Sequence, residues 1–178
     1  MTPLVWCRVC HIVLVLLAAV MSHGAARAAS ITQKEAELLV RVMGFLQPPP
    51  SGGTIAIAFD LASAASRQDA ETIAGYFGSG LKAGGVTLTA RVMDGGQLSS
   101  GGFVAIIAAR GASLDQVAAL SRAHRVPCLT GDTRAVESSQ CTIAVRSEPR
   151  VEILVNRASA ASAQVGFGSA FLMMIRRF

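Results

Sequence analysis

The chain has 178 residues, a formal net charge of +5 and aromatic side chains at only 5% of its positions. Its lysines and arginines are scattered, and the part after residue 28 contains one tyrosine and no tryptophan. A surface that binds single strands of nucleic acid needs aromatic rings on which bases stack. The composition therefore argues against nucleic acid as a partner.

The first element in chain order is an N-terminal leader. Arg8 is the only charged residue before an apolar stretch at 12–21, and Ala26-Arg27-Ala28 supplies the small residues of a cleavage site. This order is typical of a secretory signal peptide, and the apolar stretch is too short to span a bilayer. We expect a signal peptide at 1–28 and a periplasmic mature protein, 29–178, that spans no membrane. An uncleaved membrane anchor is the alternative, because a single arginine makes a weak positive start.

The mature part has the size of one domain, and its helix and strand signals alternate. A capping box, Thr32-x-x-Glu35, predicts a helix to about Leu46, where prolines follow. The pattern Ser66-x-x-Asp69 predicts a second helix to about Leu81, and Ser113 caps a third that ends near His124. The predicted strands are rich in β-branched and apolar residues and lie at 54–60, 86–93, 103–109 and 126–130, with a polar, glycine-rich loop at 95–102.

The last third of the chain departs from this alternation. Strands at 141–146 and 151–155 are so close in sequence that they predict an antiparallel hairpin. Two short helices follow at about 157–163 and 169–177, and the second is expected to pack onto the core through Phe171, Leu172, Met174 and Ile175. The whole pattern predicts a single α/β domain: a mainly parallel, Rossmann-like sheet with flanking helices, plus a C-terminal antiparallel hairpin.

Two of the four cysteines, Cys128 and Cys141, remain after the predicted cleavage. An even pair in an oxidising compartment predicts a disulfide, and two unlinked buried thiols are the alternative. A zinc site needs more ligands than this pair, and His124 is the only histidine of the mature part. We therefore expect no metal site.

The sequence lacks the patterns of common catalytic sites. Gly75, Gly78 and Gly80 fall at the end of a predicted helix, where glycine serves as a cap and not as a nucleotide fingerprint. His124 lies among basic residues at a helix end, which the helix dipole favours by itself. We predict that the protein is not an enzyme and holds no cofactor. A secreted enzyme that uses His124 as its base is the competing hypothesis.

Polar residues follow several of the predicted strands. In open α/β sheets, ligands bind outside the carboxyl ends of the strands. We expect a candidate small-ligand site at that edge, formed by Asp60, Arg110, Thr130 and Asp132. Asp94 also follows a strand. Ordinary turn polarity is the alternative explanation, because aspartate favours turns.

Several segments in a fixed order resemble the YfiR family of bacterial periplasmic proteins. They are a Pro-x-Leu-Thr-x-x-Asp-like segment within 126–132, the hairpin strands at 141–146 and 150–156, the Asn156 that ends the second strand, an alanine-rich helix, and the stretch 167–175. Together with the leader and the N-terminal helix, their order and spacing match the family over nearly the whole mature chain.

The resemblance implies regulation without catalysis. Members of that family bind the periplasmic part of an inner-membrane diguanylate cyclase and hold it inactive, so this chain would act in cyclic di-GMP signalling. They are also redox-sensitive through cysteines and tend to form homodimers. By this resemblance, a disulfide between Cys128 and Cys141 would brace the hairpin. A periplasmic sensor that binds a small ligand at the strand edge is the second expectation.

Overall fold

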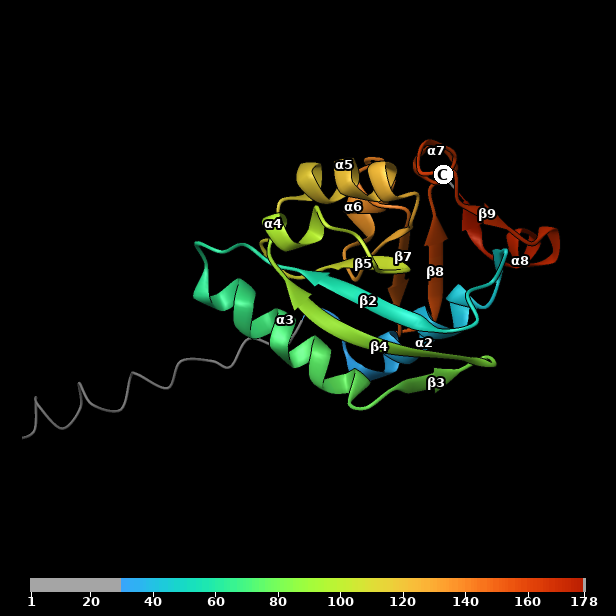
Figure 1. Ribbon diagram of the computed structural model, residues 1–178. Coiled ribbons are helices and arrows are strands. Elements are labelled where there is room, and N and C mark those ends of the chain that lie inside the picture. The colour runs from blue at the N-terminus through green and yellow to red at the C-terminus, as the bar shows by residue number, and fades with distance from the viewer. Residues whose placement is uncertain (1–29, 178) are drawn as a thin grey trace, which may run out of the picture.

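The computed structural model describes residues 30–177, and its core is a twisted, mostly parallel sheet (Figure 1). Eight strands lie in the order β10-β8-β7-β6-β5-β2-β4-β3. The five central strands are mutually parallel: β2 (Gly53–Ala58), β4 (Val86–Met93), β5 (Ala105–Ala108), β6 (Cys128–Thr130) and β7 (Ile143–Arg146). The predicted α/β class with a mainly parallel sheet is confirmed.

Both edges of the sheet carry strands of other orientation. β8 (Glu152–Val155) pairs antiparallel with β7, with Ile143 opposite Val155, so the predicted C-terminal hairpin is confirmed. β10 (Arg176–Arg177) lies parallel to β8 at one edge, and β3 (Leu81–Ala83) lies antiparallel to β4 at the other. A separate two-stranded sheet joins β1 (Leu46–Gln47) to β9 (Gly166–Phe167).

Helices cover both faces of the sheet, and each face has its own apolar core (Figure 1). One face is covered by α2 (Gln33–Met43) and α3 (Ala64–Phe77). The other is covered by α4 (Gly95–Leu98), α5 (Leu114–His124) and α6 (Thr133–Glu137). Strands β2, β5, β6 and β7 are buried on both sides over most of their length, as their apolar sequences indicate, whereas β4 alternates between buried and exposed residues. The chain ends with α7 (Arg157–Ser162) and α8 (Ser169–Met174).

The predicted capping box at the start of α2 is confirmed. The Thr32 hydroxyl accepts from the backbone N–H of Glu35, whose carboxylate accepts from the backbone N–H of Thr32. The helix ends at Met43, with Gly44 as its cap, rather than near Leu46. Leu46 instead enters β1, because its backbone pairs with β9.

The predicted start of α3 is wrong. Ser63 is the cap, and its hydroxyl accepts from the backbone N–H of Ser66. Ser66 and Asp69 lie inside the helix, and their side chains bond to other segments of the chain. At the other end, Gly78 caps the helix with a φ of 48°, and Leu81 begins β3.

Three further differences come from local capping and packing. Asp94 and Gln97 form a capping box, so the glycine-rich loop at 95–102 begins with α4. Asp132 caps α6 by accepting from the backbone N–H of Arg134. The last helix ends at Met174, because the backbone then turns extended to pair with β8.

The predicted signal peptide, residues 1–28, lies outside the described residues. Within residues 30–177, no helix is both long and apolar enough to cross a membrane.

Candidate functional site

The carboxyl ends of the parallel strands meet at one edge of the sheet, where the chain changes direction. After β2 the chain passes to β4 on one side, and β5 then returns to lie on the other side of β2. The helix after β2 covers one face and the helix after β5 covers the other. Such a reversal leaves a crevice between the two loops, and ligands of open α/β sheets bind there.

A hollow of about 420 Å³ opens beside the loop that follows β5, and we call it the Arg110 pocket. It brings together three of the four predicted ligand-site residues, Arg110, Thr130 and Asp132. The rest of its lining consists of Ser30, Ala108, Ala109, Gly111, Ala112, Leu114, Gly131 and Arg134. Its size lies in the range of small-molecule sites, which runs from about 300 to 1,000 Å³.

The fourth predicted residue, Asp60, lies elsewhere. It lines a neighbouring hollow of about 550 Å³, the Asp60 pocket, together with Asp94, Ser113 and Gln116. Gly111 lines both hollows. The loop after β5 therefore divides the strand edge into two pockets, and the predicted set is split between them.

Hydrogen bonds between residues two positions apart fix Thr130 and Asp132 in the turn after β6. Thr130 is 4% exposed, and its Oγ1 accepts from the backbone N–H of Asp132 at 3.0 Å. The Asp132 carboxylate accepts from the backbone and side chain of Arg134. That ion pair is solvent-exposed on both sides, so it contributes little to stability.

Asp69 holds two walls of the Arg110 pocket in place, and sequence reasoning missed this role. Its carboxylate accepts from the backbone N–H of Arg110 at 2.7 Å and from that of Ser30 at 2.7 Å. The Ser30 hydroxyl donates to the same carboxylate. These partners are about 40 positions away in the chain, so no local pattern identifies them.

Two glycines allow the backbone to form these walls. Gly111 has a φ of +79°, in the left-handed region that favours glycine, at the point where the chain turns between the two pockets. A β-carbon at Gly131 would collide with the carbonyl oxygen of Ser30. The turn after β6 can therefore lie directly against the segment that leads into α2.

The predicted disulfide between Cys128 and Cys141 is confirmed. It joins Cys128, the first residue of β6, to Cys141, which lies two residues before β7. The two cysteines are 13 positions apart in sequence, and their Cα atoms are 5.0 Å apart. Both residues are 1% exposed. The bridge therefore holds together two neighbouring strands of the sheet and closes the segment that contains α6.

His124, the histidine considered as a catalytic base, packs against an aromatic ring. Its ring meets that of Phe103 edge-on, with centroids 5.2 Å apart, and lies close to Gly101. In the part of the chain that the structure describes, no three His, Cys, Asp or Glu side chains gather in a way that could hold a metal ion.

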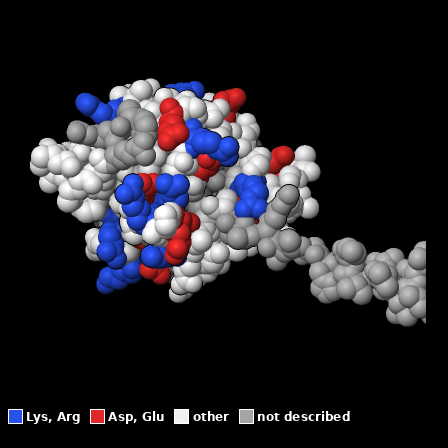
Figure 2. Space-filling model, turned by 180° about the vertical axis from the view of Figure 1, so that it is seen from behind, with Lys and Arg blue, Asp and Glu red and all other residues white. Residues whose placement is uncertain are grey.

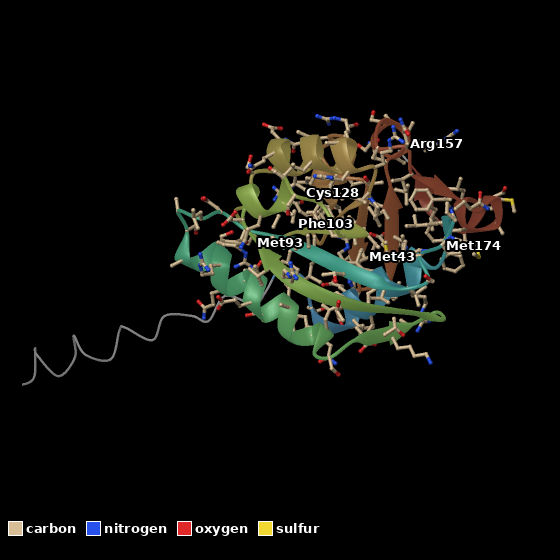
Figure 3. All side chains as sticks on the ribbon, viewed as in Figure 1. Met43, Met93, Phe103, Cys128, Arg157 and Met174 are labelled. Carbon is tan, nitrogen blue, oxygen red and sulfur yellow. A yellow bond between two sulfur atoms is a disulfide. The ribbon has the colours of Figure 1, made fainter. Side chains whose placement is uncertain are left out.

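Apolar side chains are exposed at the C-terminal end of the fold, on what we call the α8 surface. Phe45, Met173 and Met174 are 40%, 77% and 71% exposed. Phe45 stacks on Phe171 with ring centroids 4.7 Å apart, and its carbonyl accepts from the backbone N–H of Gly168, so these two contacts connect the segment after α2 to α8. Figure 3 shows Met174 at the periphery of the molecule, far from the interior Cys128.

The expected packing of the last helix is therefore only partly right. Phe171 is buried, at 3% exposed, and Leu172 and Ile175 are partly buried against the core. Met174, expected in the core, points into solvent. The helix is shorter than predicted, and Phe171 is its buried anchor, stacked against the rings of Phe45 and Phe167.

Charges are mixed over the surface. Figure 2 shows Lys and Arg interspersed with Asp and Glu on one face of the molecule, rather than gathered into a patch of one sign. One mixed cluster is at the hairpin, where Glu152 pairs with Arg146 and Arg150. Extended recognition of a polyanion would need a continuous basic surface.

Comparison with known proteins identifies a fold but no family. No family model matches the chain, and no curated protein is similar in sequence. Among solved structures, an ABC domain from Streptococcus pneumoniae in complex with L-Trp superposes with a TM-score of 0.56 at 12% identity. A conserved domain protein from Vibrio cholerae superposes with a TM-score of 0.52 at 10% identity.

Both matches cover 82% of this chain but only 60% and 59% of the other chains. This chain therefore spans about three fifths of the length of the structures that it resembles. At these identities the similarity shows a shared α/β fold and nothing further.

Proposed function

We propose that the protein is a non-catalytic regulator that acts from the periplasm by binding another protein. Its proposed partner is the periplasmic part of an inner-membrane signalling protein, a diguanylate cyclase, which it holds inactive. The choice of partner rests on the resemblance to the YfiR family. The resemblance also motivates a proposed homodimer, which light scattering on the purified protein tests directly.

The observation that carries this proposal is the α8 surface. Phe45, Met173 and Met174 expose apolar area at the same end of the fold, although burial is the usual state of such side chains. Methionine and phenylalanine are enriched in the centres of protein–protein interfaces, and exposed apolar patches mark such sites. A unit held by stacked rings can present these side chains without a large ordering cost on binding.

Cellular cyclic di-GMP tests the regulatory role. Deletion of the gene in the source bacterium should raise cyclic di-GMP, and restoration of the exported protein should lower it again. A form without residues 1–28 should fail to restore the level, because it would remain in the cytoplasm. Unchanged cyclic di-GMP after deletion contradicts the proposed partner.

Surface variants test the α8 surface itself. The double variant Met173→Ser/Met174→Ser should fold and lose repression. Leu61→Ser is the matched control, because Leu61 is also exposed, at 67%, but lies in the Asp60 pocket. Equal repression by the double variant and the wild type would exclude this surface as the contact.

A second candidate function is a periplasmic sensor of small ligands, favoured by the Arg110 pocket. The pocket lies at the carboxyl ends of β5 and β6, on the edge of the sheet where α/β folds bind ligands, and has a suitable size. One structure of similar fold was determined in complex with L-Trp. A metabolite that raises the unfolding temperature of the purified protein would support this function, since a ligand of the native state stabilises it.

A further inference from the structure

We infer that the Asp60 pocket binds a small, uncharged molecule rich in hydroxyl groups, of the sugar or polyol class, and that the carboxylates of Asp60 and Asp94 accept its hydroxyl hydrogens. This site is separate from the Arg110 pocket and from the α8 surface, so the inference goes beyond both proposed functions. Three features of the pocket carry it: its position in the sheet, the unused hydrogen-bonding atoms of its lining, and the presence of donors beside the acceptors.

The pocket lies where the strand order of the sheet reverses. The chain passes from β2 to β4 on one side of β2 and then to β5 on the other. The hollow of about 550 Å³ is lined by residues 59–61 after β2, by residues 94–96 after β4, and by residues from the loop after β5 and the first turn of α5. In open α/β sheets, ligands bind outside the carboxyl ends of the strands at such a reversal. The Asp60 pocket is therefore the crevice that this topology provides for a ligand.

Two carboxylates of the lining each have an unused oxygen. Asp60 Oδ1 accepts from the backbone N–H of Ala62 at 3.0 Å, and Asp94 Oδ1 accepts from that of Gln97 at 2.9 Å. Within residues 30–177, the Oδ2 atom of neither side chain takes part in a hydrogen bond or an ion pair. An ionised carboxylate only accepts, and hydrogen bonds to it are stronger than those between neutral groups. Each fixed carboxylate can therefore accept from a hydroxyl of a ligand.

The α5 side of the pocket supplies uncharged groups. Ser113 Oγ accepts from the backbone N–H of Gln116 at 3.4 Å, and no acceptor in the described chain takes its hydrogen. The Gln116 side-chain amide makes no hydrogen bond there either, and it lies directly against Gly95, where a β-carbon would collide with it. Leu61, which is 67% exposed, adds apolar surface for the C–H groups of a ligand. Apolar surface with a few polar groups is typical of small-molecule sites.

The lining matches a hydroxyl-bearing molecule better than an ion. An ammonium group has only hydrogens to donate, so it could use the two carboxylates but not the donors of Ser113 and Gln116. The Arg67 guanidinium lies 4.5 Å from the centroid of the Phe59 ring, which also lines the pocket, and it would repel a cation. The carboxylates would repel an anion. A hydroxyl carries no charge and can donate to one side chain while it accepts from another.

Calorimetric titration of the purified protein tests the inference. The neutral probes are D-glucose, D-galactose, D-ribose and myo-inositol, and the charged probes are putrescine and succinate. At least one neutral probe should bind saturably, with the same affinity at low and at high ionic strength, because the ligand has no charge for salt to screen. Asp60→Asn and Asp94→Asn should each weaken that binding by roughly five- to tenfold, because each replaces a charge-assisted hydrogen bond by a neutral one.

Asp132→Asn is the matched control. Asp132 also follows a strand and accepts from the backbone two positions on, but it lies in the Arg110 pocket, so its variant should bind like the wild type. Asparagine keeps a side-chain oxygen for the backbone N–H, so all three variants should fold, and urea unfolding measures this. Gln116→Ala changes an exposed side chain and should also weaken binding, which gives a second test if an aspartate variant proves unstable.

The probes separate the ligand classes. No saturable binding of any neutral probe overturns the inference, and so does equal weakening by Asp132→Asn and Asp94→Asn. Binding of putrescine without a neutral probe, lost in Asp60→Asn and Asp94→Asn, would assign the pocket to a cation instead. Binding of succinate alone would likewise contradict the proposed class. Weakening of neutral-probe binding by Asp60→Asn, Asp94→Asn and Gln116→Ala, but not by Asp132→Asn, is the expected result.

Discussion

Glu35, in the first turn of α2, accepts a hydrogen bond from the backbone N–H of Ser147, 112 residues further along the chain, at 2.9 Å. The Ser147 hydroxyl donates to the same oxygen at 3.2 Å. The second carboxylate oxygen accepts from the backbone and the hydroxyl of Thr32. One buried side chain therefore caps its own helix and holds that helix to the end of β7.

We predict that Glu35→Gln lowers the free energy of unfolding by about 1–3 kcal/mol, the usual cost of leaving a buried hydrogen-bonding group unsatisfied. The amide would place a donor where the carboxylate now accepts. Urea unfolding at neutral pH measures the change. Glu37→Gln is the control, because Glu37 is exposed on the same helix and should change stability little. Equal effects of the two variants would exclude the tertiary role of Glu35.

Glu35 should also make the fold sensitive to acid. Burial raises the pKa of Glu35, but the hydrogen bonds from Thr32 and Ser147 outweigh it and hold the pKa below the ordinary 4.5. The unfolded state therefore binds a proton more readily than the folded state. The stabilisation is present in full above the ordinary pKa and is lost as the pH falls through the folded pKa.

Urea unfolding between neutral pH and about pH 3 tests this linkage. The wild type should lose stability toward acid more steeply than Glu35→Gln, whose amide does not titrate. The pKa of Glu152 is also lowered, through its hydrogen bonds to Arg146 and Arg150, so only the difference between the two proteins reports on Glu35. Parallel pH profiles would contradict the assignment.

The sequence predicts the architecture well because helices and strands are indicated by short local patterns of residues. Apolar runs of strand length, separated by capped helices, require a parallel sheet with helices on both faces, and that sheet is present. The capping box of Thr32 and Glu35 is also a local pattern, and it is confirmed. The same local rule failed at Ser66 and Asp69, because a serine followed by an acidic residue also occurs inside helices.

The candidate site was only partly predictable because strand order decides which loops meet. Residues after four strands were expected to share one edge, and they do. The sheet places β5 between β2 and β6, and the loop after β5 then divides that edge. Asp60 is separated from Arg110 and Thr130 for this reason. The exposure of Met174 could not be predicted from the sequence either, because it depends on where the last helix ends.

Loss of the disulfide should destabilise the fold. Its two cysteines are 13 positions apart, and closure of a loop of this length is worth about 3 kcal/mol in the chain-entropy model. We predict that reduction, or the variant Cys128→Ala/Cys141→Ala, lowers the free energy of unfolding by about 2–4 kcal/mol. Chemical denaturation with and without a reductant measures this loss. The reductant should leave the midpoint of the double variant unchanged, and an unchanged midpoint of the wild type would contradict the prediction.

Asp69 should be the most sensitive single position of the Arg110 pocket, although its own side chain does not line the hollow. It is 7% exposed and accepts three hydrogen bonds, from the backbone and hydroxyl of Ser30 and from the backbone of Arg110. Asp69→Asn replaces an acceptor by a donor that faces donors, so we expect a loss of about 1–3 kcal/mol in unfolding free energy. Amide exchange should accelerate at Ser30 and Arg110, because their N–H groups lose their acceptor. Glu71→Gln, at an exposed position of the same helix, should change neither quantity, and unaltered exchange at both amides in Asp69→Asn would show that the walls are held by other contacts.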